Sequence, residues 1–340
     1  MIKPLLAKLI SRQSLTRAEA AGLLGSLIQD EAITESQIAA VLTAYAIKEE
    51  TVDELVGFAE TMRKHCSPLR TRHSLFVDTA GTGGDGAMTF NISTAAAFVI
   101  AGAGVPVAKH GNRAASSRSG SADVLSALGV KIDAPVEIAA RCLDEIGICF
   151  MFAPLYHPAM KRVFDVRRQL GFRTIFNLLG PLTNPAGAPR QVVGVAEERF
   201  VEMIAGALAA LGCERAWVVH GESKLDEISI CGRTRVAEVI GSDVNAFDLA
   251  PEDVGFPRCS INEIIGGSAE ENAEIVTNVL SGKRTDGARR VVLLNAAAAL
   301  VVTGRAQSLA GAIELATEAI DSGKALEKLE ALIELSNYYR

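Results

Sequence analysis

Cysteine pairs of the C-x-x-C type are absent from this sequence, although it contains six cysteines. Their absence argues against a zinc ribbon and against a thioredoxin-type redox site. Buried, reduced thiols in a cytoplasmic protein are the simplest interpretation of six scattered cysteines.

Long hydrophobic runs are also missing. The longest apolar stretches, such as "NAAAALVVTG", fall short of the roughly 20 residues that span a bilayer. The N-terminal stretch "MIKPLLAKLISRQSLTRAEA" lacks the long apolar core and the cleavage site of a signal peptide. We therefore expect a soluble, cytoplasmic protein that does not associate with a membrane.

An excess of positive charge is likewise absent. The 340 residues include 34 Lys and Arg against 40 Asp and Glu, which gives a net charge of −6 and a pI near 5.5. Such a balance does not favour a nucleic-acid partner, so any anion site must be a local patch. Internal repeats and low-complexity tails are not found either, and the hydrophobic fraction of 49% is ordinary for a globular protein.

Strand signals are absent before residue 74, and the first 65 or so residues read as helices. Three capping boxes predict helix starts, at Thr16 with Glu19, Thr34 with Gln37 and Thr51 with Glu54. Apolar residues then recur at helical spacing. One such stripe (Ile38, Leu42 and Tyr45) is compatible with either a core or a dimer surface.

From residue 74 onward, short apolar runs alternate with helical patterns, which predicts an α/β domain with a mostly parallel sheet. The runs are "LFVD", "VPVAK", "ICFMFA", "QVVGVA", "AWVVH" and "RRVVLLN". Residues 155–188 interrupt this rhythm and read as a crossover through the helical part. The predicted fold is thus a small all-helical domain plus a larger α/β domain whose sheet is flanked by helices.

The stretch "DTAGTGGDGAMTFNIST" (78–94) joins the first predicted strand to a helix. Its four glycines allow tight turns and close approach to a ligand, and the helix start offers free amides to a phosphate. Neither G-x-G-x-x-G nor the Walker pattern is present. A plain strand-to-helix turn is the alternative, although the acid and the hydroxyl cluster favour a binding loop.

Three further motifs follow predicted strands or helices. "KHGNRAASS" (109–117) combines cations, amides and hydroxyls suited to phosphate. "LDEIS" contains the adjacent carboxylates Asp226 and Glu227, which suit magnesium held jointly with substrate phosphates. Residues 161–173 contain five basic side chains around Asp165, and an arginine there suits a second anion such as a carboxylate. Each motif alone is also compatible with a solvated surface.

Together, the motifs resemble those of the anthranilate phosphoribosyltransferases. The resemblance rests on "GTGGD", "KHGNR-x-x-SS-x-SG-x-ADVL-x-x-LG", "HPAMK-x-V-x-x-VRR-x-LG-x-RT-x-FN-x-x-GPL-x-NP" and "LDEIS", in order through nearly the whole chain. It implies transfer of phosphoribose from 5-phosphoribosyl 1-diphosphate (PRPP) to the amine of anthranilate, in tryptophan biosynthesis. It also implies a Mg²⁺ cofactor and a homodimer, with a helical domain of residues 1–70 and part of 160–188, and an α/β domain of residues 71–160 and 189–340.

The resemblance assigns site residues by motif, without a departure at any of them. Anthranilate would contact Gly81, Asn112 and Arg167, and magnesium would be held by Ser93, Asp226 and Glu227. The PRPP site would consist of Gly81, Gly84, Asp85, Thr89, Asn91, Ile92, Ser93, Thr94, Lys109, His110, Gly111, Asn112, Arg113, Ala114, Ala115, Ser116, Ser117 and Ser121. No residue is assigned as an obligate base, because the aryl amine of anthranilate is already nucleophilic at neutral pH.

Two alternatives remain from the sequence. A pyrimidine nucleoside phosphorylase-like enzyme shares a Lys-His anion loop, but the acidic pair and the short C-terminal part argue against it. A nucleic-acid-binding relative of the same fold tends to be basic and to lack the substrate motifs, whereas this chain is acidic and keeps them.

Overall fold

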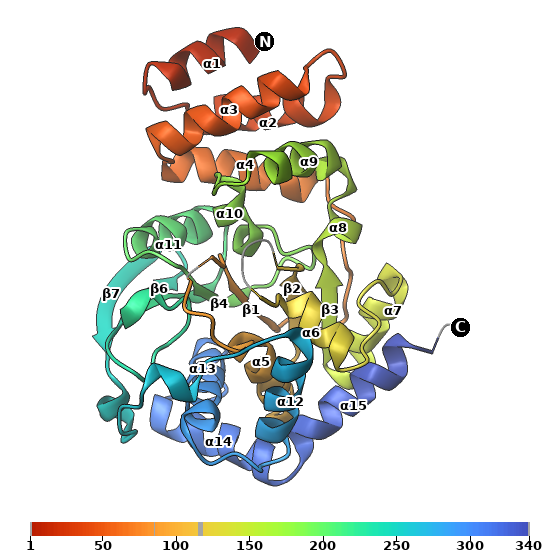
Figure 1. The fold of residues 1–340 in the computed structure, drawn as a ribbon, viewed down its shortest axis with the longest axis vertical. Coiled ribbons are helices and arrows are strands. Elements are labelled where there is room, and N and C mark those ends of the chain that lie inside the picture. Colours follow the sequence, from red (N-terminus) through yellow and green to blue (C-terminus); the bar gives the residue numbers. More distant parts are fainter. Residues whose placement is uncertain (1, 85, 115–117, 339–340) are drawn as a thin grey trace.

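A layer of helices lies above a larger α/β body in the computed structural model, which describes residues 2–84, 86–114 and 118–338 (Figure 1). The layer begins with α1 (Ile2–Ile10), α2 (Arg17–Gln29), α3 (Glu35–Lys48) and α4 (Val52–Lys64). Ile38, Leu42 and Tyr45 of α3 are fully buried within the chain, so this stripe is core. The predicted architecture of a small helical domain and a larger α/β domain is confirmed.

Each predicted capping box is present at the start of its helix. The Thr16 hydroxyl accepts from the Glu19 amide at 3.2 Å, and the Glu19 carboxylate accepts from the Thr16 amide at 3.0 Å. The same reciprocal pair forms at the starts of α3 and α4. These boxes satisfy amides that would otherwise lack partners, which is why the three starts could be located from sequence.

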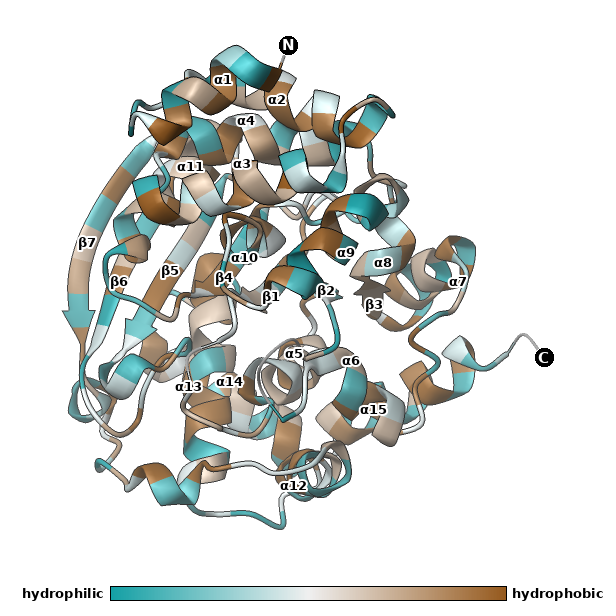
Figure 2. Ribbon diagram, turned by 45° about the horizontal axis from the view of Figure 1, so that its top comes forward, coloured by the Kyte–Doolittle hydropathy of each residue, from teal (hydrophilic) through white to brown (hydrophobic). Residues whose placement is uncertain are grey.

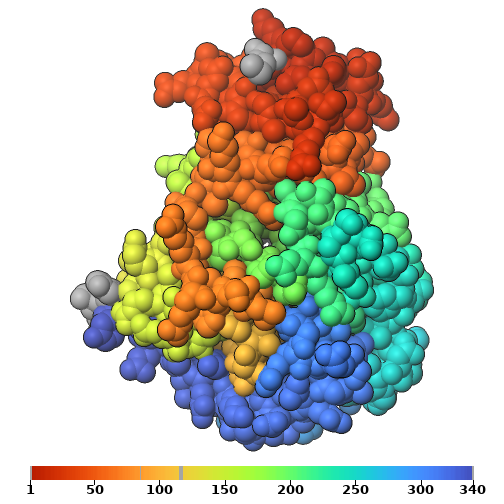
Figure 3. All heavy atoms as spheres, turned by 180° about the vertical axis from the view of Figure 1, so that it is seen from behind, coloured from red at the N-terminus to blue at the C-terminus, as the bar shows by residue number. Residues whose placement is uncertain are grey.

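The crossover segment lies against the N-terminal helices. After α8 (Ala153–Tyr156), α9 (Lys161–Leu170) packs on α3 and α2, and α10 (Phe176–Leu179) packs on α4. Seen from behind, the surface is hollowed between this layer and the α/β body (Figure 3). In Figure 2, the N-terminal helices alternate between hydrophilic and hydrophobic residues, as expected for helices with one solvent-facing side.

The central sheet has seven strands in the order β3-β2-β1-β4-β5-β6-β7. The first five positions in this order are parallel, and β6 and β7 are antiparallel. The strands are β1 (Val77–Gly81), β2 (Val107–Gly111), β3 (Ile148–Phe152), β4 (Arg190–Gly194), β5 (Arg215–Gly221), β6 (Thr234–Ile240) and β7 (Asp243–Leu249).

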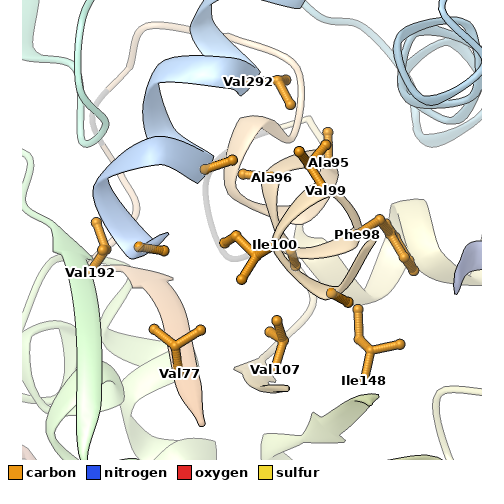
Figure 4. Packing of buried hydrophobic residues seen from close by; sticks show 14 of the residues in the cluster. Val77, Ala95, Ala96, Phe98, Val99, Ile100, Val107, Ile148, Val192 and Val292 are labelled. Carbon is orange, nitrogen blue, oxygen red and sulfur yellow. The ribbon is translucent and has the colours of Figure 1, made fainter. Parts of the chain in front are cut away.

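Helices cover both faces of the sheet. On one face, α5 (Ile92–Gly102) packs its buried side chains over Val77, Val107 and Ile148, beside α13 (Gly287–Val302) (Figure 4). On the other face, α11 (Phe200–Ala210) lies between the sheet and α4. A parallel sheet covered on both faces has strands that are apolar throughout, which explains the short apolar runs in the sequence.

Short helices and a C-terminal group complete the fold. They are α6 (Ser121–Ala127), α7 (Val136–Arg141), α12 (Ala269–Leu280), α14 (Leu309–Asp321) and α15 (Lys324–Ser336). No helix in the described part of the chain is long and apolar enough to cross a bilayer.

One predicted strand was wrong and two strands were missed. "RRVVLLN" lies inside α13, where nearly every residue is buried, so its apolar run has no periodicity to separate helix from strand. The hairpin β6–β7 was overlooked, although Gly241 at φ +61° marks its turn. Alternation in "TRVAEVI" was the signal that could have located it.

Candidate active site at the carboxyl ends of the parallel strands

The predicted loops meet at one rim of the sheet. The Gly83 amide, just beyond β1, donates to the Asp226 carboxylate at 2.9 Å. At the start of α5, the Ser93 amide donates to the Glu227 carboxylate at 3.0 Å. Lys109, from β2, reaches the Ser93 hydroxyl with its Nζ at 3.4 Å. Three motifs far apart in the sequence therefore form one cluster, as expected for loops that follow parallel strands.

Glycines at the ends of two strands make room for the acidic loop. Gly81 and Gly194 are register partners in β1 and β4. A Cβ on Gly194 would lie 1.7 Å from the Asp226 backbone oxygen, and one on Gly81 would lie 2.7 Å from the Asp226 carboxylate. Neither approach leaves space for a side chain, so these two glycines place the acidic loop directly on the sheet.

The acidic loop is also fixed from behind by Asn295, which sequence reasoning missed. This residue is buried in α13, and its side chain accepts from the Ile228 amide and donates to the Ile228 carbonyl, each at 3.0 Å. A side-chain amide that pairs with both backbone groups of one residue copies a strand hydrogen-bond pattern. Because "RRVVLLN" was predicted to be a strand, this role was not visible in the sequence.

Lys109 is almost completely buried beneath the glycine loop. Its ammonium donates to the Thr79 carbonyl at 2.5 Å and lies near the Ser93 hydroxyl. Burial lowers the pKa of Lys109, whereas the nearby charges of Asp78 and Glu227 act in the opposite direction. The side chain thus places a donor at the start of α5, where a phosphate would gain from both the lysine and the positive end of the helix dipole.

A buried network holds the start of the basic loop. The Asp78 carboxylate accepts from the His110 amide at 3.2 Å and from the Asn184 side-chain amide at 2.7 Å. Burial raises the pKa of Asp78 to about 6, although Lys109 and these hydrogen bonds oppose the change. Asp78, at the polar end of "LFVD", and Asn184, in "NP", are visible in the sequence as polar residues, but nothing in the sequence indicates that they form a hydrogen bond with each other.

His110 packs beside His157, with ring centroids 5.3 Å apart. The Nδ1 of His110 lies 3.3 Å from the Gly180 carbonyl, which can only accept, so Nδ1 carries the proton and Nε2 does not. Burial lowers the pKa of His110 to about 3 and that of His157 to about 4. Both imidazoles are therefore neutral at pH 7. Their burial opposes stability as the pH falls below about 6.5, because the unfolded chain binds protons first.

The basic loop after β2 is organised by Asp123 of α6. The Asp123 carboxylate pairs with Arg113 at 2.7 Å and accepts from the Ala114 and Gly120 amides at 2.9 and 3.0 Å. The Asn112 carbonyl accepts from the Ser121 hydroxyl at 3.4 Å. Arg113 thus has an acidic partner on the helix that follows its loop, and the sequence patterns did not indicate this organising role of Asp123.

The start of α5 is held by side chains rather than by an N-cap. Asn91 makes no capping hydrogen bond; it donates to the Ser119 carbonyl at 3.3 Å and accepts from the Asn272 side chain at 3.0 Å. Thr89 forms an isolated bridge with Ile265. Ile92 and Thr94 are buried in the first turn. The amides of this turn are engaged within the protein: they donate to nearby backbone carbonyls or, at Ser93, to Glu227. The free amides expected from the sequence are therefore not found in this turn, and an anion here would gain from the dipole of α5 instead.

Two arginines of the crossover segment are close enough for their charges to interact, and one of them contacts the glycine loop. Arg173 donates from Nη1 to the Gly84 carbonyl at 3.0 Å. Burial, together with the charge of Arg173, lowers the pKa of the Arg167 guanidinium. Among the described residues, Arg167 has no hydrogen-bond or ion-pair partner for its side chain. A half-buried cation of this kind suits an anionic ligand.

Four predicted site residues, Asp85, Ala115, Ser116 and Ser117, lie outside the described residues. Within the described ranges, no group of three or more His, Cys, Asp or Glu side chains is arranged to hold a metal. The six cysteines form no disulfide bond, although the thiols of Cys231 and Cys259 lie 3.5 Å apart; Cys142, Cys149 and Cys213 are buried and the other three are half-buried.

Amides, a buried lysine and two carboxylates at the carboxyl ends of parallel strands are typical of α/β enzymes that bind phosphorylated ligands. Residues 73–326 match a family model described as "Glycosyl transferase family, a/b domain". Residues 3–66 match one described as "Glycosyl transferase family, helical bundle domain". The fold and the site thus define a glycosyl transferase.

Individual relatives narrow this class. An anthranilate phosphoribosyltransferase of Moorella thermoacetica is 53% identical over 98% of each chain. The crystal structure of that enzyme from Thermus thermophilus has a TM-score of 0.91 at 41% identity, covering 97% of this chain and 98% of that one. A Saccharomyces cerevisiae structure in complex with PRPP and Mg has a TM-score of 0.91 at 28% identity, covering 99% and 98%. This chain therefore belongs to the anthranilate phosphoribosyltransferase family, which confirms the family inferred from its motifs.

Proposed function

We propose that this chain transfers the phosphoribosyl group of PRPP to the amine of anthranilate, giving N-(5-phosphoribosyl)anthranilate and pyrophosphate in tryptophan biosynthesis. Family membership supports this reaction. The observation that carries it is the convergence of the glycine loop, Lys109 and the acidic pair, since the segment from Gly83 to Ser93 makes hydrogen bonds with both carboxylates and with the lysine. A diphosphate needs cations and amides on one side and a metal on the other, and this rim supplies groups for both.

The substrate subsites follow from the placement of these groups. The diphosphate and ribose phosphate of PRPP would lie along the glycine loop, the first turn of α5 and the basic loop that starts at Lys109. Anthranilate would lie toward Arg167, with Asn112 and Gly81 between the two substrates. Opposite charge supports this division, because the guanidinium of Arg167 has no acidic partner in the described part of the chain and anthranilate carries a carboxylate.

The residues around Ser93 fit magnesium. Asp226, Glu227 and the Ser93 hydroxyl are hard oxygen donors, and they are too few to fill a coordination shell by themselves. Magnesium in proteins keeps several waters and shares ligands with substrate phosphates, which agrees with such a partial set. When bound, the ion would neutralise charge on the departing pyrophosphate.

The chain's own residues would act mainly by positioning and charge. As the bond from the anomeric carbon to the diphosphate oxygen breaks, Lys109 and the positive end of the α5 dipole would stabilise the negative charge that moves to the leaving group. The new bond forms between that carbon and the neutral aryl amine, so correct placement of anthranilate matters more than a base. His110 agrees with this, because burial lowers its pKa to about 3 and so makes it a poor base at pH 7.

We also propose a cytoplasmic homodimer in which residues 1–70, with part of 160–188, act as the helical domain at the interface. Residues 71–160 and 189–340 would form the PRPP-binding domain, and neither nucleic acid nor a membrane would be a partner. Exposed apolar side chains on the N-terminal helices, Ile10 and Ile47, support an interface there. Sedimentation of the full chain would test it, since a monomer at micromolar concentration would exclude this interface.

The reaction itself is tested with purified protein, PRPP, Mg²⁺ and anthranilate. We expect the fluorescence of anthranilate to disappear as it is consumed, and pyrophosphate to accumulate in equal amount. Omission of either PRPP or Mg²⁺ is the control. If fluorescence persists at high enzyme concentration, the proposed reaction is wrong.

Arg167→Ala tests the anthranilate subsite. We expect the KM for anthranilate to rise by about tenfold to a hundredfold, because a charged hydrogen bond to a carboxylate is worth about 1.5–3 kcal/mol. The KM for PRPP should change far less. Arg168→Ala is the control, because Arg168 is 81% exposed on the same helix and pairs with Asp165. Equal effects of Arg167→Ala on both substrates would remove its proposed role.

A further inference from the structure

Arg173 connects the crossover segment to the glycine loop. We call residues 161–179, which comprise α9, α10 and their linker, the arm. Arg173 lies in the linker, and its Nη1 donates to the Gly84 carbonyl at 3.0 Å. The arm carries Arg167, and Gly84 belongs to the proposed diphosphate loop. One side chain therefore joins the two proposed substrate subsites.

The arm holds Arg173 in a defined position. Gly171 ends α9 with φ +69°, and Thr174 and Ile175, directly after Arg173, are buried. The Thr174 amide donates to the Asn177 side chain at 3.0 Å. The backbone next to Arg173 is thus held by the arm, and the Arg173 side chain extends from there to the loop.

The glycine loop, in contrast, has little packing of its own. A Cβ on Gly83 or Gly86 would meet no atom within 4 Å, and both residues adopt positive φ. The loop is instead held by hydrogen bonds, from the Gly83 amide to Asp226 on one side and from Arg173 to the Gly84 carbonyl on the other. Glycine-rich backbone loses much entropy on ordering, so each of these bonds has a large influence on the loop.

The second terminal nitrogen of the Arg173 guanidinium is available to donate a hydrogen bond. Its Nη2 is buried and has no hydrogen-bond partner in the described part of the chain. Arg167 is close enough for the two positive charges to interact. A buried donor without a partner costs free energy, and so does repulsion between two guanidinium groups. An anion at this point relieves both costs and holds Arg173 against the loop.

We propose that Arg173 is a positioning residue that couples the diphosphate subsite to the anthranilate subsite through its bond to Gly84. When the glycine loop is ordered, it holds Arg173 in place, and with it the arm that carries Arg167. In return, an anion bound at Arg167 orders the glycine loop through Arg173. This inference rests on the proposed function, because it uses the substrate placement given there.

Coupling is measured by binding, without turnover. Magnesium pyrophosphate contains no phosphoribose, so anthranilate can be titrated by its fluorescence with and without it. In the unaltered protein, we expect magnesium pyrophosphate to tighten anthranilate binding at least about fivefold. In Arg173→Met, this factor should fall to about one, and kcat/KM should fall roughly tenfold to a hundredfold.

Arg168→Met is the matched control, since it removes the same group from an exposed position of the arm; it should leave both the coupling factor and kcat/KM unchanged. Thermal melting shows whether each variant is folded. If Arg173→Met is unstable, the shorter and polar Arg173→Gln replaces it, and the same results are expected of it. Unchanged coupling in either folded variant overturns the inference, as does the absence of coupling in the unaltered protein. Absence of turnover in the unaltered protein would instead overturn the proposed function.

Discussion

Replacing Asp226 by Asn together with Glu227 by Gln is expected to lower kcat/KM about a hundredfold or more. Metal-assisted charge stabilisation contributes several kcal/mol to a transition state, and the two amides are poor magnesium ligands. The magnesium concentration for half-maximal activity should also rise. Steady-state assays over a magnesium series, followed by loss of anthranilate fluorescence, measure both effects.

The two substitutions preserve the local structure. The new side-chain oxygens can still accept from the Gly83 and Ser93 amides, so the loop keeps its hydrogen bonds while it loses charge. Glu222→Gln is the matched control. Glu222 precedes the acidic pair, and its carboxylate accepts from the Arg233 amide at 2.9 Å rather than from the glycine loop or the start of α5. An unchanged magnesium profile in the double variant would contradict the proposed metal site.

Glu54→Gln is expected to lower the free energy of unfolding by about 3–5 kcal/mol. The Lys48–Glu54 ion pair is 2.8 Å long and almost wholly buried under the N-terminal layer. Glu54 also accepts from the Leu15 amide at 2.8 Å and completes the capping box of α4. The substitution keeps the shape of the side chain but leaves the buried Lys48 ammonium without its ion-pair partner. Urea denaturation followed by far-ultraviolet circular dichroism measures the change.

Glu60→Gln in the same helix is the control for Glu54→Gln. Glu60 pairs with Arg17, but both side chains are more than two-fifths exposed, and exposed pairs contribute about 0–1 kcal/mol. Similar effects of the two substitutions on the free energy of unfolding would show that the buried Lys48–Glu54 pair contributes no more to stability than an exposed pair does. Both carboxylates lie on α4, so the two substitutions are compared within the same helix.

Much of the fold followed from local patterns. The capping boxes at Thr16, Thr34 and Thr51 located three helix starts, since both partners of each box lie within one turn. Five predicted strands correspond to β1 to β5, because strands buried on both faces form compact apolar runs. The same reasoning failed for α13, whose helix is buried on every side and so has no polar face to reveal its period.

The residues of the candidate site also fall into two groups, those that the sequence indicated and those that only the structure revealed. Lys109, Asp226 and Glu227 were singled out because cations and acids stood out beside predicted strand ends, whereas Arg167 was assigned by the family resemblance. Missed were residues whose role is to support others: Asp78, Asn184, Asp123, Asn295 and Arg173. The Asp78–Asn184 bond spans 106 residues and the Ile228–Asn295 bond spans 67. No local pattern pairs residues so far apart.

The sequence by itself determined the family, the helix starts, most strands and the chemical types at the site, because these depend on neighbours within a few residues. Tertiary structure alone decided that Asp226 would rest on Gly194, that Asn295 would clamp the acidic loop and that Arg173 would reach Gly84. Those contacts form only when the packing of the sheet and its helices brings distant backbone groups within hydrogen-bonding distance, where each buried polar group must find a partner.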